Sequence, residues 1–190
     1  MGRPREFDID QALDRAMGVF WQKGYDGASL QDLLGAMQIA RGSLYKAFED
    51  KHSIYLPTLD RYDRTVVDAG IAFLSGPEAG DGLTKIRTML ESVKSDKARR
   101  GCFLCNAAID RASLDAAVET KVATMLSRLQ DAIAVALKRS RRGSRWSEAR
   151  RKSTAASILS TYMGLRVLAR AGHSAKALQA IVDRTLEAIS

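Results

Sequence analysis

The sequence predicts an all-α protein with about nine helices. Apolar residues recur every three or four positions along most of the chain, which is the period of an amphipathic helix. Few segments show the two-residue alternation of a half-buried strand, and prolines number only 3. A chain of 190 residues is long enough for one or two small domains with apolar cores.

The predicted helices of the N-terminal part are mostly short. The first begins after Asp8, which can serve as its N-cap, has its apolar face along residues 9–20, and is expected to stop at Gly24. A second helix is predicted over residues 29–37. A third fits residues 40–48, and a tight turn joins these two.

A longer helix is expected from residue 50 or 53 to about residue 74. Pro57 falls in its first turns, where a proline is tolerated best. The glycine-rich stretch 75–82 has the composition of a loop. Beyond it, the apolar periodicity predicts five further helices, near residues 86–93, 102–109, 115–139, 147–171 and 174–189.

The formal net charge of +8 is unevenly distributed along the chain. Residues 1–64 carry nine basic and ten acidic side chains, a net charge of −1. Residues 138–152 carry eight basic side chains and one acidic side chain, a net charge of +7. We expect this basic stretch to be a solvated loop; the alternatives are attraction of an acidic ligand or partner, and a second nucleic-acid contact.

Residues 29–48 have the proportions of a helix-turn-helix motif, whose second helix enters the ~12 Å wide major groove of DNA. There, Arg41 can donate two hydrogen bonds to guanine, while Gly42 and Ser43 leave room for close approach. Tyr45 and Lys46 can reach phosphates on the groove walls. Ser29, which opens the preceding helix, and Lys51, at the start of the next helix, can also contact the DNA backbone.

The same region resembles the DNA-binding domain of TetR-family transcriptional regulators. The resemblance rests on the runs Ala16-Met17-Gly18-Val19-Phe20, Gly24-Tyr25, Ser29-Leu30-Gln31-Asp32-Leu33-Leu34, Ile39-Ala40-Arg41-Gly42-Ser43-Leu44-Tyr45-Lys46-Ala47-Phe48 and Asp50-Lys51. Two positions depart from the family pattern. Gln38 replaces the usual glycine of the turn, where a left-handed backbone is expected, and Ala40 replaces a Ser or Thr cap worth roughly 1 kcal/mol. Gln38 is retained among the predicted DNA-binding residues.

The resemblance implies a DNA-binding domain over residues 6–66 and a ligand-sensing and dimerisation domain over residues 67–190. Residues 100–108 and 164–172 are also similar to one branch of the family. The family relationship further implies a homodimer, in which the last two long helices form a four-helix bundle with their partners. The interface is expected at Leu159, Leu168, Leu178, Ile181, Val182 and Leu186.

Apolar side chains of the middle helices can line a ligand pocket or simply fill the core. Tyr162 and Arg166 stand one helical turn apart and could add polar groups, although Arg166 could equally serve the dimer interface. The candidate ligand-binding residues are Phe73, Met89, Phe103, Met125, Tyr162, Met163 and Arg166.

Cys102 and Cys105 form a C-x-x-C pair. A structural zinc site takes about four ligands, and an i, i+3 pair on one helix is poorly placed for a disulfide. The two cysteines are therefore either small buried residues or a redox or electrophile sensor. In the second case Cys102 is the better candidate, because basic residues precede it and it lies near a helix N-terminus.

The basic residues Arg3 and Arg5 are predicted to be either a minor-groove arm or a solvated tail. No run approaches the ~20 apolar residues of a membrane span, and residues 1–6 lack the apolar stretch of a signal peptide, so we expect a cytoplasmic protein.

Together these features predict a ligand-responsive, homodimeric transcriptional repressor on a palindromic double-stranded DNA operator. It would release DNA when a small molecule or a thiol-reactive signal acts on the C-terminal domain. A transcriptional activator of the same fold is the alternative. A helical enzyme or ligand carrier is disfavoured, because the sequence shows no metal-spaced His/Glu cluster, phosphate-binding glycine loop or nucleophile elbow. We therefore expect no enzymatic activity, no cofactor and no metal.

Overall fold

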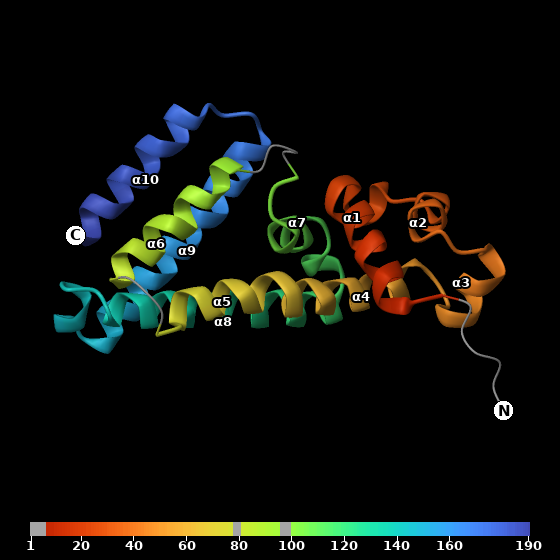
Figure 1. The fold of residues 1–190 in the computed structure, drawn as a ribbon, viewed down its shortest axis with the longest axis horizontal. Coiled ribbons are helices and arrows are strands. Elements are labelled where there is room, and N and C mark those ends of the chain that lie inside the picture. The colour runs from red at the N-terminus through yellow and green to blue at the C-terminus, as the bar shows by residue number, and fades with distance from the viewer. Residues whose placement is uncertain (1–6, 78–80, 96–99) are drawn as a thin grey trace.

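The computed structural model describes residues 7–77, 81–95 and 100–190, and these residues form helices and no strands (Figure 1). The all-α prediction is confirmed. Because α4, a π-turn and α5 follow one another without a break, the described residues form nine separate α-helical rods. Within these ranges no helix is long and apolar enough to cross a membrane. Arg3 and Arg5 lie outside the described residues.

The N-terminal end consists of α1 (Ile9–Gly27), α2 (Leu30–Met37) and α3 (Arg41–Ala47). The Asp8 carboxylate caps α1 by accepting hydrogen bonds from the amides two and three residues further on, at 2.9 and 3.3 Å. The regular helix is interrupted at Gly24, as its glycine predicts. Gly24 has φ 74° and ψ 174°, which is not helical, and residues 25–27 add one further turn beyond this kink.

The next rod comprises α4 (Lys51–Tyr62), the π-turn η1 (Asp63–Val67) and α5 (Asp68–Ser75). A capping box starts it, in which the Asp50 carboxylate accepts from the amide of Ser53 at 2.7 Å and the Ser53 hydroxyl accepts from the amide of Asp50 at 3.1 Å. The domain boundary that we predict at residues 66 and 67 falls inside this continuous rod.

The remaining elements are α6 (Gly82–Glu91), η2 (Ser92–Ser95), α7 (Phe103–Asp110), η3 (Ala112–Leu114), α8 (Ala116–Lys138), η4 (Gly143–Arg145), α9 (Glu148–Arg170) and α10 (Ala175–Ile189). Side chains cap the three longest of them. Asp115 accepts from two amides at the start of α8, and Ser147 and Ser174 each accept from the third amide of α9 and α10.

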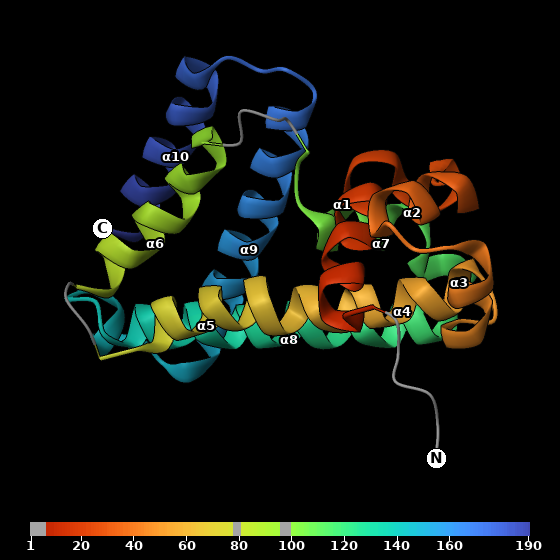
Figure 2. The ribbon, with the colours of Figure 1, turned by 45° about the vertical axis from the view of Figure 1, so that its right-hand side comes forward.

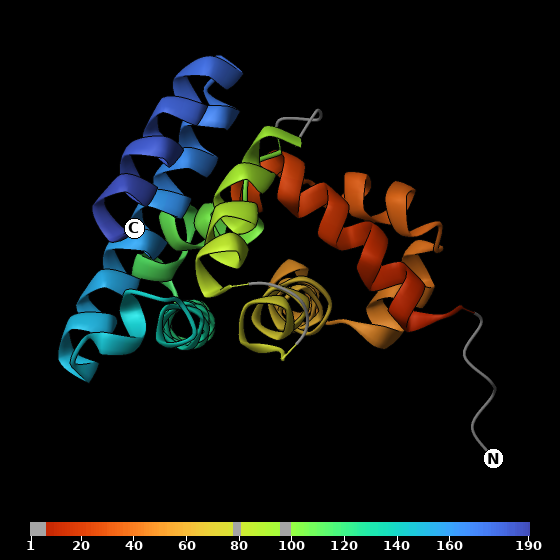
Figure 3. The ribbon, with the colours of Figure 1, turned by 60° about the vertical axis from the view of Figure 1, so that its left-hand side comes forward.

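The α4–α5 rod and α8 lie side by side along most of the molecule and carry the other helices at their two ends (Figure 1). The helices α1, α2 and α3 occupy one end (Figure 2). The opposite end holds α6, α9 and α10, and Figure 3 shows α9 and α10 side by side on the outer side of the molecule. Helix α7 lies between the two groups and contacts α1, α8 and α9.

Two apolar cores result from this arrangement. The first joins α1–α4 to α7 and the N-terminal half of α8, and it is rich in aromatic rings: Phe20, Tyr55 and Phe103 are all fully buried. The second lies between α5, α6, the C-terminal half of α8, α9 and α10. The N-terminal helices therefore share a core with α7 and α8 rather than forming a core of their own.

Candidate nucleic-acid interface and effector cavity

The turn between α2 and α3 has the left-handed backbone that the sequence pattern requires. Gln38 adopts φ 57° and ψ 41° without being a glycine. Its side-chain oxygen accepts a hydrogen bond from Arg15 Nη1 at 2.5 Å, and the same nitrogen lies 3.5 Å from the carbonyl of Met37. Arg15 on α1 thus holds the turn, so Gln38 has a structural partner in addition to its predicted place at the DNA.

The start of α2 is closed by a capping box that includes Ser29, one of the predicted DNA-binding residues. The Ser29 hydroxyl accepts from the amide of Asp32 at 3.1 Å and donates to its carboxylate at 2.7 Å, and the Ser29 amide donates to the same carboxylate at 3.0 Å. Hydrogen bonds from Lys23 and Ser29 lower the pKa of Asp32 to about 2. Both donors of Ser29 that we expected to face a phosphate are therefore already used within the protein.

Helix α3 presents a basic and aromatic surface to solvent. Arg41, Gly42, Tyr45 and Lys46 are all exposed, and Ser43 is half-buried. The guanidinium of Arg41 lies 5.9 Å from the centre of the Tyr45 ring, which is 48% exposed. Ala40 makes no side-chain cap, as its identity predicts. The opposite side of α3 is fixed by Leu44, which is fully buried in the first core.

Lys51, at the start of α4, has partners within the protein. Its ammonium group donates to the carbonyls of Tyr25 at 2.9 Å and Ala28 at 3.2 Å, and it lies 4.4 Å from the centre of the Tyr25 ring. These carbonyls belong to the last turn of α1 and to its C-cap residue, where a cation is favourable. In this structure Lys51 therefore ties α4 to α1, and its contact with DNA stays a prediction.

Polar contacts that the sequence did not reveal join the N-terminal helices to the rest of the molecule. Arg61 on α4 binds Asp14 on α1 through two hydrogen bonds and lies 2.9 Å from Asp10. His52 Nε2 lies 2.7 Å from the carboxylate of Asp115, the residue that caps α8. Arg61 and Asp14 are 47 residues apart in the chain, and His52 and Asp115 are 63 residues apart. No local sequence pattern predicts such contacts.

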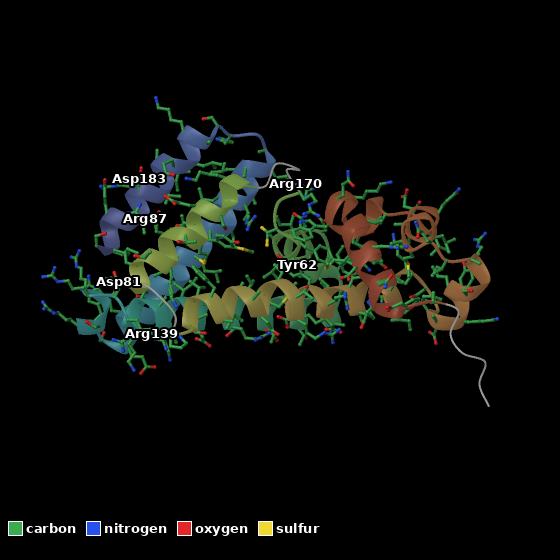
Figure 4. All side chains as sticks on the ribbon, in the orientation of Figure 1. Tyr62, Asp81, Arg87, Arg139, Arg170 and Asp183 are labelled. Carbon is green, nitrogen blue, oxygen red and sulfur yellow. The ribbon has the colours of Figure 1, made fainter. Side chains whose placement is uncertain are left out.

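A cavity of about 250 Å³ lies where the π-turn, α5, α6, α7, α8 and α9 meet. Of the predicted ligand-binding residues, Phe73, Met89 and Tyr162 line it, and Phe73 remains 44% exposed. The other walls are mainly apolar and include Val66, Val67, Leu74, Leu104 and Leu129, with Tyr62 and Cys102 adding polar atoms. Figure 4 labels Tyr62 on the side of the α4–α5 rod that faces α7.

The remaining candidates do not line this cavity. Phe103 and Met125 are about 1% exposed and belong to the first core, so their assignment to the pocket is corrected. Met163 is partly buried against both cores. Arg166 lines a neighbouring cavity of about 170 Å³, together with Asn106 and Arg170.

Both cysteines are buried free thiols. Cys102 lines both cavities, and its sulfur lies 3.5 Å from the Tyr62 hydroxyl. Burial raises the pKa of the Cys105 thiol, which keeps it in the unreactive protonated form. Among the described residues no cluster of His, Cys, Asp and Glu could hold a metal ion.

Most of the predicted dimer residues point into their own subunit. Leu178, Val182 and Leu186 on α10 are at most 4% exposed and pack in the second core, as does Leu159 on α9. In the described conformation these four side chains therefore offer a partner almost no exposed surface. The other two predicted residues, Leu168 and Ile181, are half-buried.

The basic stretch lies at the end of α8 that is far from α3, and Arg139 marks this end in Figure 4. Several of its cations bind backbone carbonyls: Arg139 those of Ser75 and Gly76, and Arg142 that of Ser190. Arg150 stacks on Trp146, with the guanidinium 4.5 Å from the ring centre. Part of the charge therefore closes helix ends rather than facing solvent freely.

The fold and the α2–α3 unit define a helix-turn-helix transcriptional regulator, and the comparisons with known proteins agree. The sequence model described as "Bacterial regulatory proteins, tetR family" matches residues 12–56. The model described as "Transcriptional regulator LmrA/YxaF-like, C-terminal domain" matches residues 84–184, more than half of the chain. The chain belongs to the TetR family of transcriptional regulators, and it is a regulator rather than an enzyme.

Individual relatives support this membership. The chain is 32% identical over 136 residues to the HTH-type transcriptional regulator YezE of Bacillus subtilis, covering 70% of this chain and 69% of YezE. It is 48% identical over 61 residues to the HTH-type transcriptional repressor ComR of Escherichia coli, a match that covers 32% of this chain and 29% of ComR. A cysteine mutant of the TetR-family regulator CifR, complexed with 26-bp double-strand operator DNA, superposes with a TM-score of 0.81 at 30% identity, covering 98% of this chain and 99% of that one.

Proposed function

We propose that this regulator acts in the cytoplasm as a homodimeric repressor, and that α3 reads each half of a palindromic operator. The α2–turn–α3 unit carries the proposal, because it presents Arg41, Tyr45 and Lys46 together on one exposed helix. Arg41 would donate to guanine O6 and N7, and Lys46 and Tyr45 would contact phosphates. The operator complex of CifR and the repressor ComR support the same mode of action by similarity.

The dimer would form through the outer faces of α9 and α10. On α9 this face carries exposed small residues and Val167, which is 45% exposed. A Cβ added at Gly164 would have open space around it, with no neighbouring atom of the subunit within 4 Å. Small residues let two helices approach closely, and a twofold dimer places two α3 helices on half-sites about 34–36 Å apart, or somewhat further.

The signal would enter the C-terminal part at the 250 Å³ cavity. The π-turn residues Val66 and Val67 line this cavity, and the same rod continues into α4, which packs against α1. A ligand that displaces the π-turn would therefore move the DNA-binding helices. Cys102 lines the same cavity, so a thiol-reactive compound acting there would have the same route.

The test measures binding to labelled DNA from the intergenic region beside this protein's own gene. Fluorescence anisotropy reports the affinity. Arg41→Ala should weaken specific binding by about 1–3 kcal/mol, roughly 5- to 150-fold, and relax the preference at one base pair. Arg145→Ala, in the distant basic stretch, is the matched control and should leave affinity unchanged. Absence of binding by the wild type even at low salt would contradict the proposal.

Two further readouts in the same system test the finer statements. Transcription in vitro from a promoter that overlaps the bound site should fall when protein is added, and a rise would indicate an activator. An electrophile such as N-ethylmaleimide should release DNA from the wild type but not from Cys102→Ser. Equal release from both proteins would exclude Cys102 as the sensor.

A further inference from the structure

Arg166 is a largely buried cation without an acidic partner. Its Nε and Nη2 donate to the hydroxyl of Tyr162 at 3.1 and 2.7 Å, and its guanidinium lies 5.1 Å from the centre of the same ring. Across the described ranges no carboxylate lies within ion-pair distance of it. The contrast with Arg61 and Arg128 is clear, since each of these binds two aspartates.

A buried charge is costly unless a counter-charge accompanies it. A phenol hydroxyl supplies hydrogen-bond acceptance but no net negative charge. The Tyr162–Arg166 pair therefore leaves a positive charge at the cavity wall that an anion could neutralise. Folding alone gives no reason to keep this charge there, because an apolar residue would pack beside Tyr162 at a lower desolvation cost.

The two cavities adjoin at this pair. Tyr162 lines the apolar 250 Å³ cavity, Arg166 lines the 170 Å³ cavity, and Cys102 lines both. Asp110 also borders the smaller cavity, but its carboxylate lies beside Gly24 on α1. A molecule that extends from the larger cavity to the smaller one would place an apolar body among Val67, Phe73 and Leu129 and its other end at Arg166.

We propose that the effector of this regulator is an apolar carboxylic acid, whose ring system or hydrocarbon chain fills the larger cavity and whose carboxylate binds the guanidinium of Arg166. This inference rests on the proposed effector role of the cavity. An apolar cavity of ~150 Å³ is enough for benzene, so a 250 Å³ cavity suits a body of about two fused rings or a medium-length chain. Arg166 would exchange its bonds to the phenol, or share them, for charge-assisted bonds to the carboxylate.

The experiment is isothermal titration calorimetry on the full chain without DNA, so that its outcome is independent of operator binding. The probes are 2-naphthoate and decanoate, each beside its uncharged analogue, 2-naphthalenemethanol and decan-1-ol. The wild type should bind at least one acid ten-fold or more tightly than the matching alcohol. Arg166→Met, which keeps the apolar stem, should remove this preference and leave alcohol binding unchanged.

Three control proteins give the result its meaning. Arg64→Met, an exposed arginine on the π-turn, should bind like the wild type. Gly70→Leu should weaken acid and alcohol alike, because Gly70 lines the larger cavity. Arg166→Lys should retain part of the preference for the acid. Light scattering on Arg166→Met checks that the subunit assembly is unchanged.

Several outcomes would overturn the proposal. They are an equal affinity of acid and alcohol for the wild type, a preference that survives in Arg166→Met, and no binding of either acid at millimolar concentration. A change of assembly in Arg166→Met without loss of acid binding would assign the guanidinium to a subunit interface instead. Failure of the DNA-binding test would leave these titrations unaffected, and the reverse also holds.

Discussion

At the scale of single residues, two lysines of the DNA-binding end have different tasks. Lys46 is exposed on α3, whereas Lys51 binds the carbonyls of Tyr25 and Ala28. Lys51→Ala should lower the free energy of unfolding by about 1–2 kcal/mol, because it removes charge-assisted hydrogen bonds from the end of α1. Lys46→Ala should change stability by less than about 0.5 kcal/mol but weaken binding to all DNA sequences and reduce the salt dependence.

Urea denaturation and a salt series of DNA titrations measure both effects. Equal stability of the two variants would show that the Lys51 contacts contribute nothing. An unchanged salt slope for Lys46→Ala would remove that residue from the phosphate contacts.

The same pair shows what the sequence can predict about a site. The exposed face of α3 follows from its helical spacing, so Arg41, Tyr45 and Lys46 were placed correctly on the surface. The direction of Lys51 does not follow, because its partners lie 23 and 26 residues upstream and its flexible stem reaches either way. Arg15, which holds the turn through Gln38, was missed for the same reason.

At the scale of elements, the π-turn is the least regular part of the long rod, and Arg128 on α8 holds it. Nη1 of Arg128 lies 2.7 and 2.8 Å from the carboxylate oxygens of Asp63, and Nη2 binds Asp68. These aspartates are five residues apart, which is the hydrogen-bond spacing of a π-turn. In an α-helix they would point about 140° apart, so one guanidinium could hardly bind both.

Arg128→Gln should therefore loosen the π-turn without unfolding the protein. Its side chain is 39% exposed, so we expect a loss of only about 0.5–1 kcal/mol in the free energy of unfolding. Amide hydrogen exchange over residues 63–68 should become faster. Arg87→Gln, whose ion-pair distances are 3.9 and 4.0 Å, is the control and should not alter exchange in this segment. Unchanged exchange in Arg128→Gln would show that the π-turn does not depend on the bridge.

The helices themselves are largely predictable from the sequence. The π-turn corresponds to only one irregular spacing of buried residues. Buried positions follow at a spacing of four from Thr58 to Tyr62 and then of five to Val67. A periodicity analysis treats a single five-residue spacing of this kind as part of one continuous helix. The apolar face of α10 was also recognised, but an amphipathic pattern does not reveal which neighbour covers it. The leucines assigned to a partner subunit are in fact covered by the second core.

At the scale of the whole molecule, the two cores explain how a signal could travel. The first core includes the DNA-binding helices together with α7 and half of α8, so these parts should move as one body. The 250 Å³ cavity is lined by members of both cores, including Cys102 of the first and Leu74 of the second. A ligand there would change the angle between the DNA-binding end and the α9–α10 end rather than deform either.

Such a change matters only if α9 and α10 hold two subunits together. Gly164→Arg tests this. Gly164 is exposed and a Cβ there meets open space, so the substitution should leave the fold and the unfolding temperature unchanged. It should convert the dimer to monomers in light scattering and weaken operator binding at least ten-fold, since one half-site then lacks its linked partner. Ala149→Arg, an exposed position in the first turn of α9, is the matched control. A Gly164→Arg protein that remains dimeric would move the interface to another face, and a monomer that retains full operator affinity would show that paired half-sites are not needed.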